Sequence, residues 1–380
     1  MSRIVINAIC AKRIAGGGFQ VAMNFVRTAM MDNAASQEYF YLLSSDMAQT
    51  LGVDNNEHIR VFPNQPDFVH TYLQVRRELK QWEKSVKPDV IYSLVAPCYF
   101  SFKSKEVMRV SNAWVTHPNE YAKRTLTWKD KVYNAIYYTI QRMLIKKGKY
   151  FAVQTDYMAE QVARLAKVPR ENVKTIGNIL PVIYKSLDCT PVQESDYVDI
   201  ACVAAPYPHK NLDIIPSILK HLRDDRGIIN VRIHVTMPES STLWQRMRDE
   251  LKRDGLMENV VNHGRLTQEQ LAELYRHCQL MFLPTLLEVF SASLLEGMYF
   301  QLAIVASDFP FNREVTKDAA LYFRPTDGRD AAEKIAEVIN NGELREKLIE
   351  NGMERITHFG DYDGHYKGVI SFLEEVAKEY

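Results

Sequence analysis

The sequence predicts an α/β protein of two domains, each built on a parallel β-sheet. Three observations carry this expectation. The 380 residues exceed what one ordinary hydrophobic core can hold. Strand-like apolar runs alternate with helical patterns through both halves, which favours parallel sheets. A Gly16-Gly17-Gly18 loop separates the first strand from the first helix, as at the start of a βα unit.

The first half begins with a strand and continues the alternation to about residue 180. Helical spacing is expected from Phe19 to Met30, over 69–86 and over 156–166. Strands are expected at 3–9, 38–43, 58–62, 89–95, 109–115, 150–154 and 173–177.

A linker with two prolines, 178–196, precedes a second alternating series. Strands are expected at 197–203, 229–236, 259–263, 280–283, 303–307 and 320–323. Helices are expected at 211–223, 241–253, 267–277, 292–300, 329–340, 343–356 and 362–379. We therefore expect a first domain over 1–180, joined by the C-terminal helix 362–380, and a second domain over 181–361.

Composition is that of a soluble globular protein, with 46% apolar and 11% aromatic residues. Basic and acidic residues both total 47, but their distribution is uneven. Residues 1–180 hold 25 Lys and Arg against 15 Asp and Glu, whereas the rest holds 22 against 32. This asymmetry predicts an anionic partner for the first half, and chance composition is the alternative.

Five cysteines without metal or redox spacing indicate a reducing compartment. No apolar run approaches the ~18–20 residues of a membrane span. Lys12 and Arg13 interrupt the first apolar run, so we interpret it as a strand and not as a signal peptide. We expect a cytoplasmic protein.

One basic, aromatic stretch, 121–149, stands apart. It holds eight Lys and Arg with one acid, Asp130, and interleaves them with Trp128 and several tyrosines. Such an amphipathic stretch can lie on the anionic inner face of a membrane. The alternative is an ordinary helix with a core face and a solvated charged face.

Two glutamates lie close together in 284–297, after the apolar run 280–283. Glu288 falls on a loop, and Glu296 falls about one turn into a helix that starts near Ser291. Carboxylates in apolar surroundings are costly to bury unless something pairs with them. The N–H groups of Ser291, Ala292 and Ser293 form a helix N-terminus that can bind phosphate. The alternative is that both acids only favour the helix dipole.

Four further residues follow strands or open helices. Lys210 lies at an expected helix start, where a cation is unfavourable unless an anionic ligand binds there. Gly17 and Gly18 allow a diphosphate to approach the backbone closely. His117 follows an expected strand. The alternatives are that Lys210 is a solvated surface lysine, that the glycines form only a flexible bend, and that His117 has a structural role.

These motifs, taken in order, resemble those of glycosyltransferase family 4, the retaining enzymes of the GT-B fold among the glycosyl transferases group 1. The resemblance is strongest over 197–357. The matching segments are Pro208-His209-Lys210-Asn211, the stretch 280–297, Ala306-Ser307-Asp308-Phe309-Pro310, Arg313-Glu314-Val315 and 318–323. The fold it implies has two Rossmann-like domains facing across a cleft.

The resemblance also implies roles for the candidate residues. Glu288 would bind hydroxyls of the donor sugar, Glu296 both ribose hydroxyls, and Lys210 the diphosphate. His117 would contact the donor sugar, so Glu288, His117 and Lys210 form the expected catalytic set. The implied activity moves a sugar, with retention, from a UDP- or GDP-sugar to a hydroxyl of a glycan or lipid-linked glycan acceptor.

The sequence departs from the family at one point. The family has an arginine shortly before the lysine, but 203–207 reads Val-Ala-Ala-Pro-Tyr. Either fewer charges hold the diphosphate, or another group such as Arg265 replaces the arginine.

We expect no metal, because histidines and acids form no ligand cluster in the sequence. We also expect no cofactor and no nucleic-acid partner. Surface polysaccharide or lipopolysaccharide synthesis is the expected setting, with the protein peripheral on the inner face of the cell membrane. A nucleotide-sugar epimerase, a glycan phosphorylase or a non-catalytic nucleotide-sugar-binding protein of the same fold are the alternatives.

Overall fold

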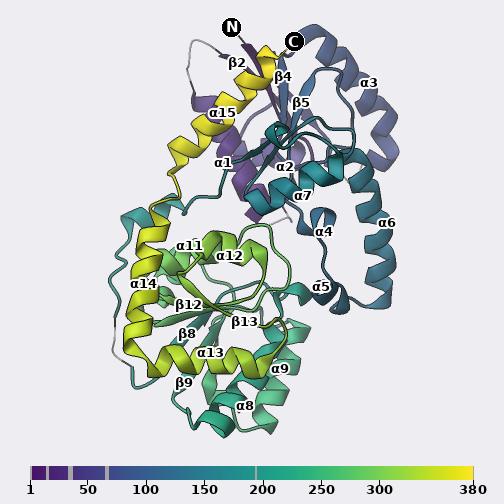
Figure 1. Cartoon of the computed structure of the whole chain (residues 1–380). Coiled ribbons are helices and arrows are strands. Elements are labelled where there is room, and N and C mark those ends of the chain that lie inside the picture. Colours follow the sequence, from purple (N-terminus) through teal and green to yellow (C-terminus); the bar gives the residue numbers. More distant parts are fainter. Residues whose placement is uncertain (1, 14–16, 33–36, 65–67, 193–194, 380) are drawn as a thin grey trace. The chain divides into compact units, whose positions relative to one another are not determined.

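The computed structural model describes residues 2–13, 17–32, 37–64, 68–192 and 195–379. It divides into two compact units, shown as ribbons in Figure 1. The first unit comprises Met1–His117, Asn134–Ile176 and Asp363–Tyr380, and the second comprises Pro118–Tyr133 and Gly177–Tyr362.

The first unit is built on a seven-stranded parallel sheet of order β3-β2-β1-β4-β5-β6-β7. Its strands are β1 (Ser2–Ala8), β2 (Gln37–Ser44), β3 (Ile59–Phe62), β4 (Val90–Ser93), β5 (Lys105–Arg109), β6 (Tyr150–Val153) and β7 (Val173–Thr175). Its helices are α1 (Gly17–Met31), α2 (Ser45–Leu51), α3 (Phe68–Val86), α4 (Ala113–Thr116), α7 (Asp156–Ala166) and α15 (Tyr362–Lys378).

Side-chain caps and a C-terminal contact stabilise these elements. The hydroxyl of Thr155 accepts the N–H of Met158 and so caps the start of α7. From α15, Tyr366 packs its ring 5.2 Å from that of Phe25 on α1. The Tyr366 hydroxyl also donates to Asp32 at 2.8 Å. The last helix is therefore part of the core of the first unit.

The second unit contains a six-stranded parallel sheet of order β10-β9-β8-β11-β12-β13. Its strands are β8 (Val198–Cys202), β9 (Val231–Val235), β10 (Val260–Asn262), β11 (Leu280–Leu283), β12 (Ala303–Ser307) and β13 (Ala320–Phe323). Its helices are α5 (Glu120–Arg124), α8 (Ile215–Arg226), α9 (Thr242–Arg253), α10 (Gln268–Arg276), α11 (Ala292–Tyr299), α12 (Pro310–Thr316), α13 (Gly328–Asn340) and α14 (Gly342–Ile356).

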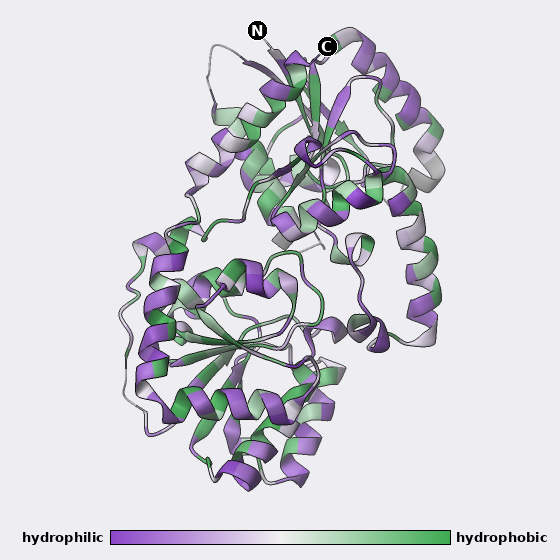
Figure 2. Cartoon of the chain, viewed as in Figure 1, coloured by the Kyte–Doolittle hydropathy of each residue, from purple (hydrophilic) through white to green (hydrophobic). Residues whose placement is uncertain are grey.

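Both faces of this sheet are buried, so its central strands are almost continuously hydrophobic (Figure 2). Buried residues of α8, α9 and α13 form the core on one face. Helix α11 packs against β11 and β12, and Gly297 allows a close approach. A Cβ at Gly297 would lie only 2.8 Å from the sulfur of Met281 and 3.3 Å from Ile304. This contact fixes α11, and with it Glu296, against the sheet.

The two parallel sheets confirm the predicted α/β class, but the expected strand at 109–115 is wrong. Strand β5 ends at Arg109, and Asn112 starts the short helix α4 by accepting the N–H of Trp114. Asn is a strong helix N-cap residue, so the apolar residues that follow Asn112 form a helix and do not continue the strand.

The segment Pro118–Tyr133 belongs to the second unit, whereas the expected division at residue 180 assigned it to the first. Asn119 donates to the carbonyl of Leu286 at 2.6 Å. The ring of Tyr121 meets Phe309 edge-on at 5.7 Å. Helix α6 (Trp128–Ile145) then continues from this segment back into the first unit.

Candidate functional site

The sheet of the second unit reverses its strand order between β8 and β11. From β8 the chain proceeds outward to β9 and β10, and then returns to β11 beside β8. In open parallel sheets, ligands bind outside the carboxyl ends of the strands at such a reversal. The loops that follow Cys202 of β8 and Leu283 of β11 therefore define the candidate site of this unit.

The two loops are joined through one backbone carbonyl. The N–H of Leu286 donates to the carbonyl of His209 at 2.8 Å, and the Thr285 hydroxyl approaches the same oxygen at 3.4 Å. Thr285 is buried, and its own carbonyl accepts the hydroxyl of Ser307 from β12. Contacts from β12 and from the loop after β8 thus hold the loop after β11 in place. They fix the backbone position from which the side chain of Glu288 extends.

Lys210 and Glu288 form an ion pair across these loops. Nζ of Lys210 donates to Oε2 of Glu288, and the two side chains are 20% and 21% exposed. The structure thus brings together two residues that the sequence predicted separately for the donor site. Partial burial makes the pair stronger than an ion pair in open water, and a bound anion would compete for the lysine.

Lys210 lies in a 3₁₀ turn, η5 (Pro208–Lys210), and not at a helix start as expected. Asn211 follows in a left-handed conformation with φ of 56°, and α8 begins only at Ile215. The left-handed residue interrupts the helix that was expected from 211. The argument that Lys210 opposes a helix dipole therefore fails, and Glu288 is what balances its charge.

His209 lies between the two loops, and the sequence argument named it only as part of a motif. Burial, together with the neighbouring charge of Lys210, lowers the pKa of His209 from 6.5 to about 4. The ring is therefore neutral at pH 7. It stacks on Tyr207 with 5.8 Å between ring centres and 7° between planes.

Glu296 is buried on α11, and two tyrosine hydroxyls contact its carboxylate. Tyr275 donates to Oε2 at 2.7 Å, and Tyr184 donates to Oε1 at 3.4 Å. Burial raises the pKa of Glu296, and both hydrogen bonds oppose that rise. These donors are the partners that a carboxylate in apolar surroundings requires.

Sequence reasoning missed both tyrosines because they lie far along the chain from Glu296. Tyr275 is on α10 and Tyr184 is in the turn η4 (Val182–Ser186), within the expected linker. Both are fully buried, and both rings pack on Phe300 with 5.3 Å between centres. The only signal in the sequence was the need for some partner to Glu296.

The N-terminus of α11 opens beside the loop that carries Glu288. Ser291 is the N-cap residue, and its side chain makes no capping hydrogen bond. Ser291 is buried, Ser293 is partly exposed and Ala292 is exposed. The first N–H groups of a helix have no partner within the helix, so this terminus can bind an anion.

Arg265 lies after β10, two strands away from β8, and is exposed. It lines a cavity of about 400 Å³ at the carboxyl ends of β8, β9 and β10. The other lining residues are Val203, Ala205, Pro206, Tyr207, Thr236, Pro238, Leu266 and Leu271. A mostly apolar wall with one arginine fits a flat heterocycle better than it fits a diphosphate.

The remaining predicted residues belong to the first unit. Gly17 begins α1 and Gly18 follows it, whereas Gly16 lies outside the described residues. A Cβ at Gly18 would meet no described atom within 4 Å, so packing does not require glycine there. His117 is buried, with Nδ1 2.7 Å from the hydroxyl of Thr116, and its ring meets Tyr157 edge-on at 5.1 Å.

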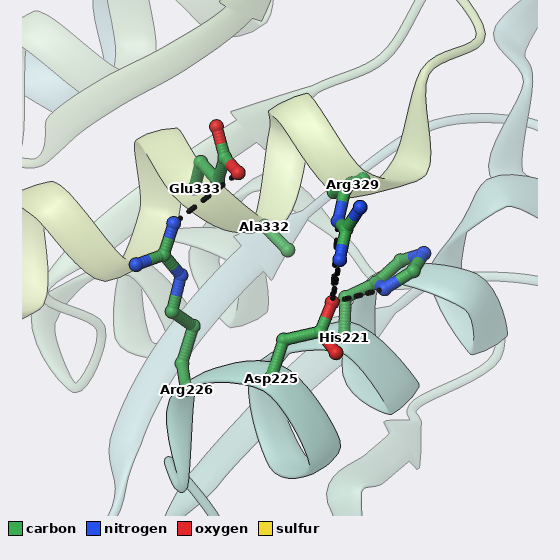
Figure 3. A pocket seen from close by; sticks show the side chains of 6 residues that line it. All are labelled: His221, Asp225, Arg226, Arg329, Ala332 and Glu333. Atoms are coloured by element: carbon green, nitrogen blue, oxygen red, sulfur yellow. Dashed lines mark hydrogen bonds and ion pairs between the residues drawn. The ribbon is translucent and has the colours of Figure 1, made fainter.

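A smaller cavity of about 150 Å³ between α8 and α13 is lined by ion pairs (Figure 3). Asp225 pairs with His221 at 2.9 Å and with Arg329 at 3.0 Å, and Arg226 pairs with Glu333 at 3.2 Å. These side chains largely satisfy one another. We interpret this cavity as part of the contact between the two helices.

Two Rossmann-like units, the second with a site at its strand reversal, define the GT-B class of glycosyltransferase folds. A glycosyltransferase from Rickettsia africae has a TM-score of 0.74 at 11% identity, covering 100% of both chains. HepE from Anabaena, solved in complex with UDP, has a TM-score of 0.71 at 13% identity, covering 99% of this chain and 100% of HepE. At such identities the likeness establishes the fold, and it confirms the GT-B expectation.

The sequence of the second unit is also similar to a known family. Residues 191–355 match the family of glycosyl transferases group 1. The match includes Lys210, Arg265, Glu288 and Glu296. Over these residues the chain is therefore similar to the glycosyl transferases group 1, in agreement with the resemblance.

Two related sequences align with a large part of the chain. An uncharacterized glycosyltransferase of Methanocaldococcus jannaschii is 25% identical over 235 residues, which are 61% of this chain and 64% of that protein. The O-antigen chain mannosyltransferase RfbU of Salmonella typhimurium is 23% identical over 244 residues, which are 64% and 63%. The chain thus spans just under two thirds of the length of these relatives.

Proposed function

We propose that the protein transfers a sugar, with retained anomeric configuration, from a nucleotide diphosphate sugar to a hydroxyl of a glycan or lipid-linked glycan acceptor. The observation that carries this proposal is the Lys210–Glu288 ion pair at the strand reversal of the second unit. A lysine and a hydroxyl-binding carboxylate, side by side, suit the junction between a diphosphate and a sugar.

In this proposal, Lys210 and the N-terminus of α11 hold the diphosphate. Lys210 neutralises charge, and the N–H groups of Ala292 and Ser293 donate to phosphate oxygens. Because Lys210 pairs with Glu288, a diphosphate would compete with Glu288 for the lysine. Glu288 is then available to accept hydroxyls of the donor sugar.

The nucleoside would lie toward β10. The cavity lined by Arg265 has a volume typical of small-molecule sites. Its lining includes Tyr207, whose carbonyl accepts the N–H of Lys210. Arg265 is therefore better suited to contact the base than to bind the diphosphate, which was the role expected for it from the sequence. Each oxygen of Glu296 accepts one tyrosine hydroxyl and retains capacity for a second donor, which suits the two ribose hydroxyls.

The reaction we propose needs no protein nucleophile. The acceptor hydroxyl attacks the anomeric carbon from the side of the leaving group, while the bond from that carbon to the phosphate oxygen breaks. The hydroxyl proton passes to a phosphate oxygen, and the nucleoside diphosphate leaves. Lys210 and the α11 N–H groups stabilise the charge that develops on the diphosphate. Independence from metal ions and cofactors remains a prediction, as do roles for Gly17, Gly18 and His117.

The relatives support the choice of substrates. HepE was solved with UDP and with UDP-glucose, which favours a uridine nucleotide over a guanosine one. RfbU is an O-antigen chain mannosyltransferase, and a structural neighbour, WaaB, is a lipopolysaccharide outer core galactosyltransferase. We therefore propose a surface polysaccharide acceptor and a location at the cytoplasmic face of the cell membrane.

The test is turnover of labelled UDP- and GDP-sugars by the wild type and by Lys210→Ala and Glu296→Ala. We expect release of nucleoside diphosphate or transfer to acceptor by the wild type, and a large loss in both variants. Near-normal activity in both variants would overturn the site assignment. Binding of a nucleotide without any turnover would instead support a non-catalytic binding protein, and an altered sugar without an acceptor would support an epimerase.

A further inference from the structure

Helix α6 carries an apolar stripe along one face, and the side chains of this stripe are exposed. Trp128, Val132, Ile136, Ile140 and Met143 recur at helical spacing and are between 47% and 72% exposed. Residues four and three apart lie on the same side of a helix, so these five side chains form one line about 22 Å long. Tyr133, at 64% exposed, widens the stripe. Figure 2 shows hydrophobic colouring along this helix.

The opposite face of α6 holds the helix on the protein. Gln141 and Ile145 are buried there. Arg142 donates to the carbonyls of Val115 and Trp114, both at 2.8 Å. Two polar anchors and Ile145 therefore hold the inner face, while the apolar side chains of the stripe lie on the outer face. An apolar outer face is not expected of a helix that meets only water on that side.

Basic residues flank both ends of the stripe. Lys129 and Lys131 lie in the first turn, and Lys146 and Lys147 follow the last. Among the described residues, none of these four lysines has an ion-pair partner, whereas Lys123 and Lys149 of the same stretch pair with Glu120 and Glu379. The single acid of the stretch, Asp130, accepts the hydroxyl of Thr127.

We propose that the outer face of α6 docks onto an anionic phospholipid membrane. Its apolar stripe would enter the interface between headgroups and acyl chains, and the lysines would contact lipid phosphates. In the described part of the chain, no helix is long and apolar enough to cross a membrane, so the contact is a surface one. The proposal does not depend on the sugar transfer, although it suits an acceptor held by lipid.

Charge favours a membrane over a second copy of the chain as the occupant. In a two-fold dimer formed by antiparallel α6 helices, Lys129 and Lys131 of one copy would face Lys146 and Lys147 of the other. Only Asp130 is available in this stretch to offset that repulsion. An anionic lipid surface instead neutralises all four lysines.

The test is co-sedimentation of the full chain with vesicles of phosphatidylcholine alone or with about one-third phosphatidylglycerol. We expect binding that requires the anionic lipid and weakens at about 0.5 M NaCl. Ile136→Glu combined with Ile140→Glu should lower the partition coefficient at least about tenfold. Lys146→Gln combined with Lys147→Gln should lower it about 25-fold, since each lysine contributes about fivefold.

The matched control is Leu73→Glu on α3, which makes the same change at a side chain that is 65% exposed elsewhere. It should bind as the wild type does. A second readout needs no disruptive variant. Of the four tryptophans, Trp128 is the most exposed, so vesicles should shift the emission to the blue, and Trp128→Phe should abolish the shift.

Three outcomes would overturn the proposal. The first is an equal loss of binding in the Leu73 variant and the stripe variant, and the second is binding that does not depend on the anionic lipid. The third is that the wild type binds no vesicles and forms a dimer in sedimentation velocity, which Ile136→Glu combined with Ile140→Glu dissociates. That third result would assign the stripe to a second copy of the chain.

Discussion

Replacing Lys210 by alanine removes both the ion pair with Glu288 and the cation that we assign to the donor diphosphate. The two side chains of the pair are about four-fifths buried. Its loss should cost little stability, on the order of 1 kcal/mol, because Glu288 still reaches water. The effect on the nucleotide should be larger. A charge-assisted hydrogen bond contributes about 1.5–3 kcal/mol, which corresponds to roughly 10- to 150-fold weaker binding of a nucleoside diphosphate.

Turnover should fall further than binding, because charge accumulates on the diphosphate as the glycosidic bond breaks. Loss of one preorganised electrostatic contact lowers kcat by about 10²–10³-fold. Calorimetry with UDP and GDP measures the first effect, and single-turnover release of nucleoside diphosphate measures the second. Lys220→Ala, an exposed lysine of α8 in the same unit, is the matched control.

The reasoning would be refuted if Lys210→Ala bound the nucleoside diphosphate within about threefold of the wild type, since one charged contact is worth at least tenfold. A fall in affinity equal to that of the Lys220 control would refute it as well. A large loss of melting temperature in Lys210→Ala alone would show instead that the pair is mainly structural.

Three further predictions follow from the same contacts. Glu288→Gln removes the carboxylate that competes for Lys210, so UDP should bind up to about fivefold more tightly while sugar transfer slows. Calorimetry and turnover measured on one preparation check that the affinity for UDP rises while the transfer rate falls. Tyr275→Phe removes a hydroxyl donor to buried Glu296 and should lower the free energy of unfolding by about 1–3 kcal/mol in urea denaturation. The lowered pKa of His209 means that the unfolded chain binds a proton first as pH falls below 6.5, so stability is lost between pH 6.5 and about 4. At pH 5 this loss is about 2 kcal/mol, and His209→Gln should remove that part of the pH dependence.

The regular elements of the second unit were predictable from the chain alone. Strands β11, β12 and β13 have the expected bounds, because each is a short apolar run between turn residues. The region around residue 110 was not predictable in this way. Its apolar residues suit a strand or a helix, and the decision rests on one capping contact, from Asn112 to Trp114.

The candidate site also has features that the local sequence predicts and features that it does not. Glu288, Glu296 and Lys210 stand out by residue type and position after strands, which is local information. Their partners do not. The Lys210–Glu288 contact joins residues 78 apart in the chain, and Tyr184 is 112 residues from Glu296. Only the order of strands in the sheet brings such residues together, and no periodicity in the sequence encodes that order at the level of single side chains.

The expected basic, aromatic stretch shows how structure sharpens a prediction from composition. The sequence placed eight basic residues and many aromatics in 121–149 and left two interpretations open. The arrangement on α6 separates the residues by face: Arg142 is directed inward and Ile136 and Ile140 outward. A helix with a core face and a charged solvated face does not account for the exposure of Ile136 and Ile140, and this exposure is why we propose the membrane contact.

The central claim is that the second unit recognises the diphosphate of a nucleotide through Lys210 and the N-terminus of α11. Melting temperature in the presence of uridine, UMP and UDP, with the guanosine series in parallel, tests it most directly. We predict that one diphosphate raises the melting temperature well above its own monophosphate and nucleoside, and that Lys210→Ala removes this difference. Equal shifts for the monophosphate and the diphosphate in the wild type would contradict the claim.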